Sequence, residues 1–336
     1  MNLRIELRSG NMLICVVSKM VSGSKVLVTG GAGFIGSHLV DRLLHEGYEV
    51  VVLDNFFSGK KQNLLSHIKD KSFCLVQGDV CKIRDIQKAT EDAEAIFHFA
   101  AITSIPLSVK RPVFVNKVNL MGTLNVLNAS LKRRIRRFIY ASTCAVYGKP
   151  KFLPLTEEHP TEPMSPYGIS KLAAEHYCKA FYHLYSLKTI VLRLFNVYGP
   201  RQSHGSYAGV ISKFVDSLKS GKQPIIYGDG RQTRDFVHVN DVVEACMLSL
   251  KCQSCAGETV NIGTGRATTI NELAKILIRL FERPNIEPLY VEHRSGDIQD
   301  SFADVTNAKK LFGYEPKITL SEGLEMLLRD ETKEYG

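Results

Sequence analysis

Tyr167 and Lys171 are the residues whose spacing most directly suggests chemistry, because they stand four positions apart. Positions i and i+4 share one face of a helix, so a phenol and an ammonium could point at the same reacting atom. A free phenol has a pKa of about 10, and a neighbouring ammonium would lower that pKa toward the range of a general base. Ser165 and Pro166 suit the start of such a helix. The spacing alone would equally fit an exposed tyrosine and a solvated lysine.

A glycine-rich turn lies near the start of the chain, where Val26–Thr29 runs into GGAGFIG at 30–36 and a helical pattern follows. Glycines there let a strand turn sharply and let the backbone approach a pyrophosphate. The second predicted strand ends at Asp54, 18 residues after Gly36, where a carboxylate can accept from a ribose 2′-hydroxyl and repel a 2′-phosphate. This pattern predicts NAD rather than NADP. Asp79 follows the third predicted strand and could reach the adenine amine or simply cap its loop.

A hydroxyl donor is expected at the end of a strand, and Ser142-Thr143 supplies one 24 residues before Tyr167. A dinucleotide site, a tyrosine base and a hydroxyl donor together suit hydride transfer at a secondary alcohol. In such a reaction the cofactor carries the redox chemistry, and the protein supplies positioning and proton transfer.

The elements that must position these residues alternate from residue 25 onward between short β-branched segments and helical patterns. This alternation produces right-handed crossovers and a parallel sheet covered on both faces. We therefore expect an α/β, doubly wound parallel-sheet Rossmann fold whose ligand binds at the carboxyl ends of the strands. The predicted strands are Lys25–Thr29, Glu49–Leu53, Ser72–Gln77, Ala95–Phe99, Phe138–Ser142 and Thr189–Arg193, and the predicted helices cover 34–46, 83–90, 113–131 and 167–186.

The alternation loosens after about residue 195, where turn signals separate shorter elements. We predict a non-structural N-terminal extension at 1–24 and an NAD-binding Rossmann domain at 25–195. Residues 196–336 are expected mainly to form a smaller lobe over the crevice of the sheet, with some segments returning to the Rossmann domain.

With these residues the chain resembles the extended short-chain dehydrogenase/reductase family, most closely the nucleotide-sugar 4-epimerases of the UDP-glucose 4-epimerase type. The similarity covers residues 24–330. The resemblance implies tightly held NAD, a UDP-sugar in the lobe at 196–336, and a homodimer. The motifs that carry it are TGGAGFIGSHL, LDNFFSG, GDV, HFAA, STCAVYG, SPYGISK, LRLFNVYGPRQ, GDGRQTRDFVHVND and RSGD.

The resemblance also implies individual roles, with Tyr167 as the base, Lys171 as its partner and Thr143 as the donor to the sugar O4. Its implied cofactor contacts are Gly30, Gly33, Phe34, Ile35, Gly36, Asp54, Asn55, Asp79, Val80, Ala100, Ala101, Asn116, Ser142, Tyr167 and Lys171. Its implied substrate contacts are Ser104, Thr143, Tyr167, Asn196, Tyr227, Arg234, Arg294, Asp297 and Ser301. Arginines suit a diphosphate independently, because the guanidinium fork pairs with its oxygens bidentately.

Two positions separate this chain from related branches. Sugar 4,6-dehydratases carry Asp-Glu directly after the threonine, and UDP-glucuronate decarboxylases carry a Glu two positions after it, whereas this chain has Cys144 and Ala145. Elimination is therefore disfavoured and epimerisation is favoured. In the family the position of Ser301 gates the pocket at the sugar C2, where a tyrosine would restrict the substrate to UDP-glucose and UDP-galactose. A serine would leave room for an N-acetyl group.

Composition excludes several other classes. The chain has 336 residues, 44% apolar and 23% charged, without a run that resembles a membrane span, so we expect a globular protein without a membrane partner. Its net charge is +9, but no recognition element for nucleic acid is found. The densest basic cluster, 132–137, is expected to be solvated at a helix end. Cys252-Gln253-Ser254-Cys255 has no second pair, so a surface loop is expected, with a disulfide as the minor alternative and no metal site.

Two alternatives remain open at this stage. The same site could serve another UDP-sugar, such as a uronate or a pentose. The chain could be an NAD-sensing regulator without activity, although such proteins typically lose the tyrosine or the lysine. The N-terminal segment has no clear signal peptide, so a cytoplasmic location is expected.

Overall fold

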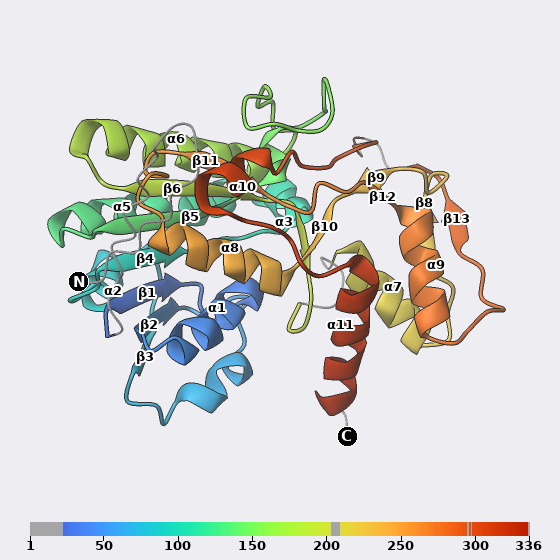
Figure 1. Ribbon diagram of the computed structural model, residues 1–336, viewed down its shortest axis with the longest axis horizontal. Coiled ribbons are helices and arrows are strands. Elements are labelled where there is room, and N and C mark those ends of the chain that lie inside the picture. The colour runs from blue at the N-terminus through green and yellow to red at the C-terminus, as the bar shows by residue number, and fades with distance from the viewer. Residues whose placement is uncertain (1–22, 203–208, 294–295, 297, 335–336) are drawn as a thin grey trace, which may run out of the picture.

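The computed structural model describes residues 23–202, 209–293, 296 and 298–334, and a seven-stranded sheet lies at its centre (Figure 1). The strand order is β11-β6-β5-β4-β1-β2-β3, and all of these pairings are parallel. With helices on both faces, the predicted doubly wound fold is confirmed. The strands are β1 (Lys25–Thr29), β2 (Glu49–Asp54), β3 (Phe73–Gln77), β4 (Ala95–His98), β5 (Arg137–Thr143), β6 (Thr189–Leu194) and β11 (Thr259–Ile262).

The predicted strands agree with β1 to β6 within one residue at each end. Strands that are buried on both faces are continuously apolar, and Val26, Leu27 and Val28 of β1 are all fully buried. The seventh strand, β11, was not predicted. It pairs with β6 and comes from the C-terminal part of the chain.

Helices from both halves of the sequence cover the sheet. Leu39 of α1 and Val242 of α8 share one core with β1, whereas Val126 of α5 and Ala174 of α6 share the core on the opposite face. These core helices are α1 (Phe34–His45), α2 (Ile83–Ala89), α5 (Gly122–Lys132), α6 (Pro166–Tyr185) and α8 (Val239–Lys251).

The prediction of one continuous α-helix over 113–131 is wrong, because a π-helical turn interrupts it. The segment divides into α4 (Pro112–Asn116), a π-helical turn at Lys117–Met121, and α5. A π-turn widens a helix locally and often accompanies a functional residue. Here the turn contains Asn119, whose side chain is buried.

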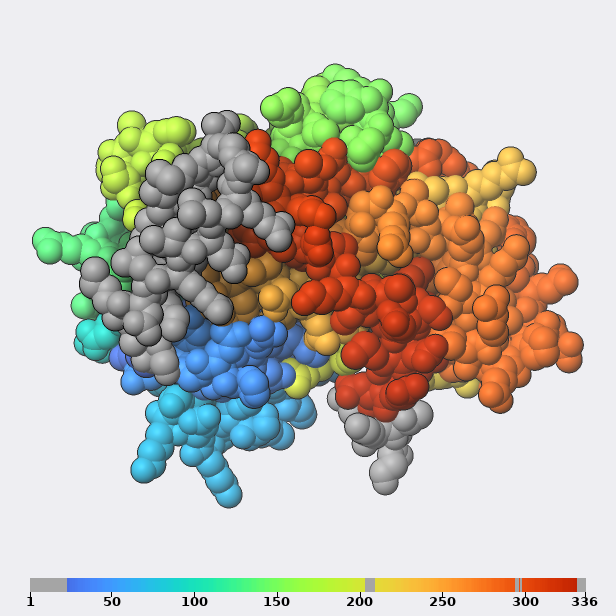
Figure 2. All heavy atoms as spheres, in the orientation of Figure 1, coloured from blue at the N-terminus to red at the C-terminus, as the bar shows by residue number. Residues whose placement is uncertain are grey.

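The remaining C-terminal elements form a separate hydrophobic core around α7 (Val210–Lys219), α9 (Ile270–Leu280) and α11 (Leu320–Glu334). Three short strand pairs accompany these helices, and α10 (Thr306–Phe312) returns to pack beside β11. Figure 2 shows the C-terminal segment in red lying between the blue segment near the N-terminus and the orange region of the chain. The strand pairs are β7 (Asn196–Tyr198) with β10 (Phe236–His238), β9 (Thr233–Arg234) with β12 (Thr268–Thr269), and β8 (Ile225–Tyr227) with β13 (Leu289–Val291).

Two expectations about surface residues are wrong. Cys252 and Cys255 are buried free thiols rather than members of a surface loop. Arg137, at the end of the basic cluster, is also buried, because its guanidinium donates to the carbonyl oxygens of Ser249, at 2.9 Å, and of Cys252. The C-terminal end of α8 therefore needs this buried cation to satisfy its last carbonyls.

Two general features complete the fold. No helix among the described residues is long and apolar enough to cross a membrane. Within the same residues, no group of three His, Cys, Asp or Glu side chains is arranged to hold a metal ion. The N-terminal extension predicted at 1–24 lies almost entirely outside the described residues.

Candidate active site

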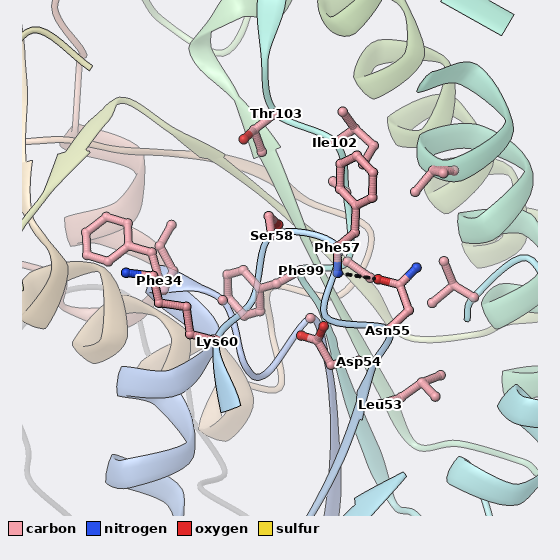
Figure 3. Close-up of a pocket in the computed structure, with 18 of the residues that line it drawn as sticks. Phe34, Leu53, Asp54, Asn55, Phe57, Ser58, Lys60, Phe99, Ile102 and Thr103 are labelled. Atoms are coloured by element: carbon pink, nitrogen blue, oxygen red, sulfur yellow. Dashed lines mark hydrogen bonds between the residues drawn. The ribbon is translucent and has the colours of Figure 1, made fainter. Parts of the chain in front are cut away.

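A cavity of about 630 Å³ opens at the carboxyl ends of β1 and β4, where the strand order reverses (Figure 3). Gly30 has a φ of +71°, and a Cβ there would lie 2.7 Å from the backbone nitrogen of Ala100. A Cβ on Gly36 would collide with the carbonyl oxygen of Gly30. Both glycines are therefore required by the turn. The predicted cofactor residues that line this cavity are Gly30, Gly33, Phe34, Ile35, Gly36, Asp54, Asn55, Asp79, Val80, Ala100 and Ala101.

Asp54 lies at the end of β2 and is 7% exposed. Its carboxylate accepts hydrogen bonds from the backbone nitrogens of Ala32, at 3.0 Å, and Phe56, at 2.8 Å. Burial raises the pKa of Asp54, and these two hydrogen bonds counteract the rise. Figure 3 places Asp54 in the wall of the cavity beside Asn55, where the chain turns away from β2. The glycine cradle and this carboxylate fit the dinucleotide expected from the sequence.

Asp79 has one of the two roles that the sequence left open, because it caps its loop, and its contact with the adenine amine stays a prediction. It lines the cavity, and its carboxylate also caps the local turn by accepting from the backbone nitrogen of Cys81 at 2.8 Å. The second carboxylate oxygen accepts from the side-chain amide of Asn55 at 3.3 Å. Both residues are therefore fixed at the cavity wall.

The position of Asp54 leads to a prediction on cofactor choice. We expect the purified protein to carry NAD, and the apoprotein to bind NAD more tightly than NADP, because the carboxylate repels a 2′-phosphate. Asp54→Asn should reduce this difference by about tenfold, which corresponds to about 1.4 kcal/mol. Isothermal titration with both cofactors measures the effect, and Asp70→Asn, at an exposed residue, is the control. Equal affinities of the wild type for NAD and NADP would contradict the prediction.

His98, at the end of β4, is hydrogen-bonded to the end of β1, which leads into the glycine-rich turn at 30–36. Its ring forms hydrogen bonds with the hydroxyls of Thr29, at 2.7 Å, and Thr123, at 2.9 Å. The Thr29 hydroxyl also accepts from the backbone nitrogen of Ala100 at 3.3 Å. Burial lowers the pKa of His98 to about 3, so the ring is neutral in the folded protein.

The neutral state of His98 predicts a pH-dependent stability. The unfolded chain takes up a proton near pH 6.5 and the folded protein does not, so stability is complete above that pH and decreases below it. Between pH 6.5 and 5 this one group should lower the free energy of unfolding by roughly 1.5 kcal/mol. Chemical denaturation at both pH values should show that His98→Asn loses this slope, whereas His67→Asn retains it. An unchanged slope in His98→Asn would refute the assignment.

A second cavity, of about 530 Å³, adjoins the first, since Gly209 lines both. Thr143, at the end of β5, and Tyr167, in the first turn of α6, both line it. The helix begins as the sequence predicted, with Pro166 in its first turn and the Ser165 hydroxyl accepting from the backbone nitrogen of Gly168 at 3.1 Å. The predicted substrate residues that line this cavity are Thr143, Tyr167, Asn196, Tyr227, Arg234 and Ser301.

The acidity of Tyr167 differs from the expectation. Burial raises the pKa of Tyr167 to about 12, although a hydrogen bond with Thr143 partly counteracts the rise. Lys171 is 4% exposed, its Nζ lies 4.2 Å from the centre of the Tyr140 ring, and burial lowers its pKa to about 7. Burial therefore outweighs the lowering of the Tyr167 pKa that a neighbouring ammonium would produce.

The two positions after Thr143 carry no acid or base. Cys144 and Ala145 both line the second cavity. Burial raises the pKa of the Cys144 thiol to about 11, so it is uncharged at neutral pH. Among the described residues of this lining, Tyr167 is therefore the candidate proton acceptor, and the Thr143 hydroxyl is its hydrogen-bond partner.

The structure places several other predicted residues outside the cavities. Asn116 is exposed at the end of α4 and does not line the cofactor cavity. The Ser142 hydroxyl donates to the carboxylate of Glu175. Ser104 caps α3 (Ile105–Lys110), with its hydroxyl accepting from the backbone nitrogen of Leu107 at 3.2 Å. The predicted substrate residues Arg294 and Asp297 lie outside the described residues.

Sequence reasoning missed two features of the site. Asn119, one helical turn beyond Asn116, is buried and donates to the hydroxyl of Ser170 at 3.0 Å, within the segment between Tyr167 and Lys171. Its place three positions before Gly122, in Asn119-Leu-Met-Gly-Thr, was the available signal. Residues of α7, including Lys213 and Phe214, close the second cavity, and no motif marks them.

Comparison with known proteins agrees with this geometry. The family model described as "NAD dependent epimerase/dehydratase family" matches residues 26–263. The UDP-glucose 4-epimerase of Thermotoga maritima, solved with UDP-glucose, is 40% identical, with a TM-score of 0.88 over 93% of this chain and 100% of that chain. The UDP-N-acetylglucosamine 4-epimerase of Methanobrevibacter ruminantium is 35% identical, with a TM-score of 0.89 over 94% and 100% of the two chains. UDP-glucuronic acid decarboxylase 1 of Xenopus tropicalis is 35% identical over 92% of this chain and 72% of its own length.

Proposed function

Because this chain belongs to the NAD dependent epimerase/dehydratase family, we propose that it is an NAD-dependent nucleotide-sugar 4-epimerase. The substrates that we propose are the pairs UDP-glucose/UDP-galactose and UDP-GlcNAc/UDP-GalNAc. The observation that carries the proposal is the second cavity, where Tyr167 and Thr143 lie together while Cys144 and Ala145 offer no acid or base for elimination.

In the proposed reaction, each of these side chains has a separate role. Tyr167 takes the proton from the sugar O4 and later returns it, and Thr143 holds that oxygen by a hydrogen bond. When bound, NAD supplies the hydride acceptor and a positive ring near the phenol. The 4-keto sugar rotates between the two transfers, so the enzyme must hold the nucleotide firmly and the sugar loosely. Arg234, which lines the cavity, suits the diphosphate.

The proposed breadth of substrate rests on Ser301. This residue is 7% exposed and lines the same cavity as Tyr167. A serine at the family's C2 position leaves space that an N-acetyl group can fill. The wide cavity supports both pairs of sugars.

The test is to incubate purified protein with UDP-glucose, UDP-GlcNAc, UDP-glucuronate and UDP-xylose, and to resolve the C4 epimers by chromatography. We expect conversion of the first two. Conversion of UDP-glucuronate or UDP-xylose alone would establish the uronate or pentose alternative. NAD binding without conversion of any sugar would favour a non-catalytic regulator.

We also propose that the enzyme is a homodimer that acts in the cytoplasm. Large apolar side chains on α3, α4 and α6 are exposed, with Val113 at 83%, and such patches are typical of interfaces between subunits. The cysteines among the described residues are free thiols, as expected in a reducing compartment. Cys15 lies outside the described residues. The apolar side chains are Ile105, Val109, Val113, Ile169, Tyr177, Leu184 and Tyr185.

The dimer proposal predicts that Val113→Asp yields a monomer. A carboxylate at the centre of an apolar interface loses its hydration without gaining a partner, so association should weaken by at least about tenfold. Light scattering after size exclusion measures the mass. Met326→Asp, at an exposed helical position on α11, is the matched control and should remain dimeric. A monomeric wild type, or a dimeric Val113→Asp variant, would refute this interface.

A further inference from the structure

Helix α6 carries a third ionisable residue on the face that presents Tyr167 and Lys171. Glu175 follows Lys171 by four positions, so it lies one helical turn further along the same face. Its side chain is 1% exposed. A buried carboxylate is unfavourable unless it is paired and hydrogen-bonded, so its partners indicate its purpose.

The carboxylate of Glu175 connects helix α6 to two strands of the sheet, β5 and β6. The hydroxyl of Ser142, the residue before Thr143 on β5, donates to Oε1. Arg193, on β6, donates from Nε to Oε1 at 3.1 Å and from Nη2 to Oε2 at 2.8 Å. The strand end that carries Thr143 is therefore tied to the helix that carries Tyr167 through one side chain.

Arg193 forms a buried ion pair with this carboxylate. Burial would lower the pKa of Arg193, but the hydrogen bonds that it donates to Glu175 outweigh burial and raise it. The guanidinium also donates to the carbonyl oxygen of Glu157 at 3.2 Å and lies 4.8 Å from the centre of the Tyr147 ring. Replacement of a buried ion pair by apolar residues is often neutral or stabilising, so stability alone does not explain why this pair is present.

We propose that Glu175 is a positioning residue of the active site, which holds the Thr143 strand end against helix α6 and keeps the ammonium of Lys171 charged in its buried position. This role deepens the proposed epimerase function and rests on it for the consequence in turnover. A charged Lys171 favours the deprotonated form of the Tyr167 phenol, so Glu175 acts on the reaction through two other residues.

The proposed effect of Glu175 on the charge of Lys171 is argued from the ionisable groups around Lys171. Burial lowers the pKa of Lys171, and Glu175 is the first of the groups that counteract this effect. The titratable and charged groups around Lys171 and Glu175 are Tyr140 on β5, Cys178 on α6, Arg193 on β6 and His98 on β4, whose ring is neutral. Both the tyrosine and the cysteine have raised pKa values and are neutral at pH 7, so Glu175 is the anion that faces Lys171 from this set.

The test follows the Lys171 ammonium directly by NMR of protein labelled with ε-¹³C-lysine, in which the Lys171 signal is assigned with Lys171→Met. We expect the midpoint of the Lys171 titration to fall by at least about one pH unit in Glu175→Gln, in the range for loss of a nearby opposite charge. Glu175→Asp keeps the charge and should retain the wild-type midpoint. An unchanged midpoint in Glu175→Gln would overturn the proposal.

A second arm separates positioning from stability. The double variant Glu175→Gln/Arg193→Met removes both buried charges and should regain the melting temperature that Glu175→Gln loses. We expect its kcat to stay at least about tenfold below the wild type with KM nearly unchanged, because the interaction is needed in the transition state rather than for binding. Recovery of both kcat and the Lys171 midpoint in the double variant would show a structural role only. A wild type that converts no sugar would refute the proposed function, while the NMR titration would still decide the role of Glu175.

Discussion

Tyr167→Phe should lower kcat by at least about a hundredfold, the lower range for general acid–base catalysis, while UDP-sugar binding changes little. The substitution removes one oxygen and leaves the ring in place. The hydroxyl of Thr143 stays paired, because it also accepts from the backbone nitrogen of Ala145 at 3.2 Å. The variant therefore tests proton transfer rather than the integrity of the cavity. Turnover is measured with UDP-galactose, and binding is measured by calorimetry with UDP-glucose.

The same helix provides the matched control for this experiment. Tyr177 lies on α6 and is 42% exposed, so Tyr177→Phe makes the same chemical change outside the cavity. This control should retain wild-type turnover. Wild-type turnover in Tyr167→Phe would remove Tyr167 from the mechanism, and loss of UDP-glucose binding in Tyr167→Phe would show that the phenol is needed to bind substrate.

The sheet and the cofactor turn were predictable because local sequence determines them. Strands buried on both faces must be continuously apolar, which located β1 to β6 closely. Glycine was needed at Gly30 and Gly36 because any Cβ there would meet backbone atoms. These requirements act over a few residues, so they are visible in the sequence without an account of distant contacts.

Other features depend on contacts that are distant in sequence. Strand β11 has only four residues, and its place beside β6 follows from pairing across about 70 positions. Asn116 and Asn119 look alike in the sequence, and only the π-turn decides which of them turns inward. The Tyr-Lys spacing reveals the partner of Tyr167, but not the burial that raises the pKa of Tyr167 and lowers that of Lys171.

Ser301→Tyr should lower kcat/KM for the UDP-GlcNAc/UDP-GalNAc pair by about 5–150-fold, the equivalent of about 1–3 kcal/mol of overpacking, and should spare the UDP-glucose/UDP-galactose pair. The backbone around Ser301 has little freedom to move away. On one side, the backbone nitrogen of Thr233 donates to the carbonyl oxygen of Gln299 at 2.9 Å. On the other side, the backbone nitrogen of Leu155 donates to the carbonyl oxygen of Phe302 at 2.9 Å. A tyrosine ring at this buried position must therefore occupy the cavity.

Comparison of kcat/KM for both sugar pairs distinguishes a side chain that fills the C2 pocket from one that disturbs the whole cavity. A phenol that merely disturbed the cavity would lower kcat/KM for both pairs equally, because both use Tyr167 and Thr143 for the same proton transfer. A phenol that fills the C2 pocket penalises only the sugars that place an acetamido group there, since close-packed sites tolerate no extra volume. Ser301→Ala, which adds no volume, should leave the ratio between the pairs within about twofold of the wild type. Equal losses on both pairs in Ser301→Tyr, or a wild type without activity on UDP-GlcNAc, would reject the gate, and the selectivity would then depend on another side chain of this cavity.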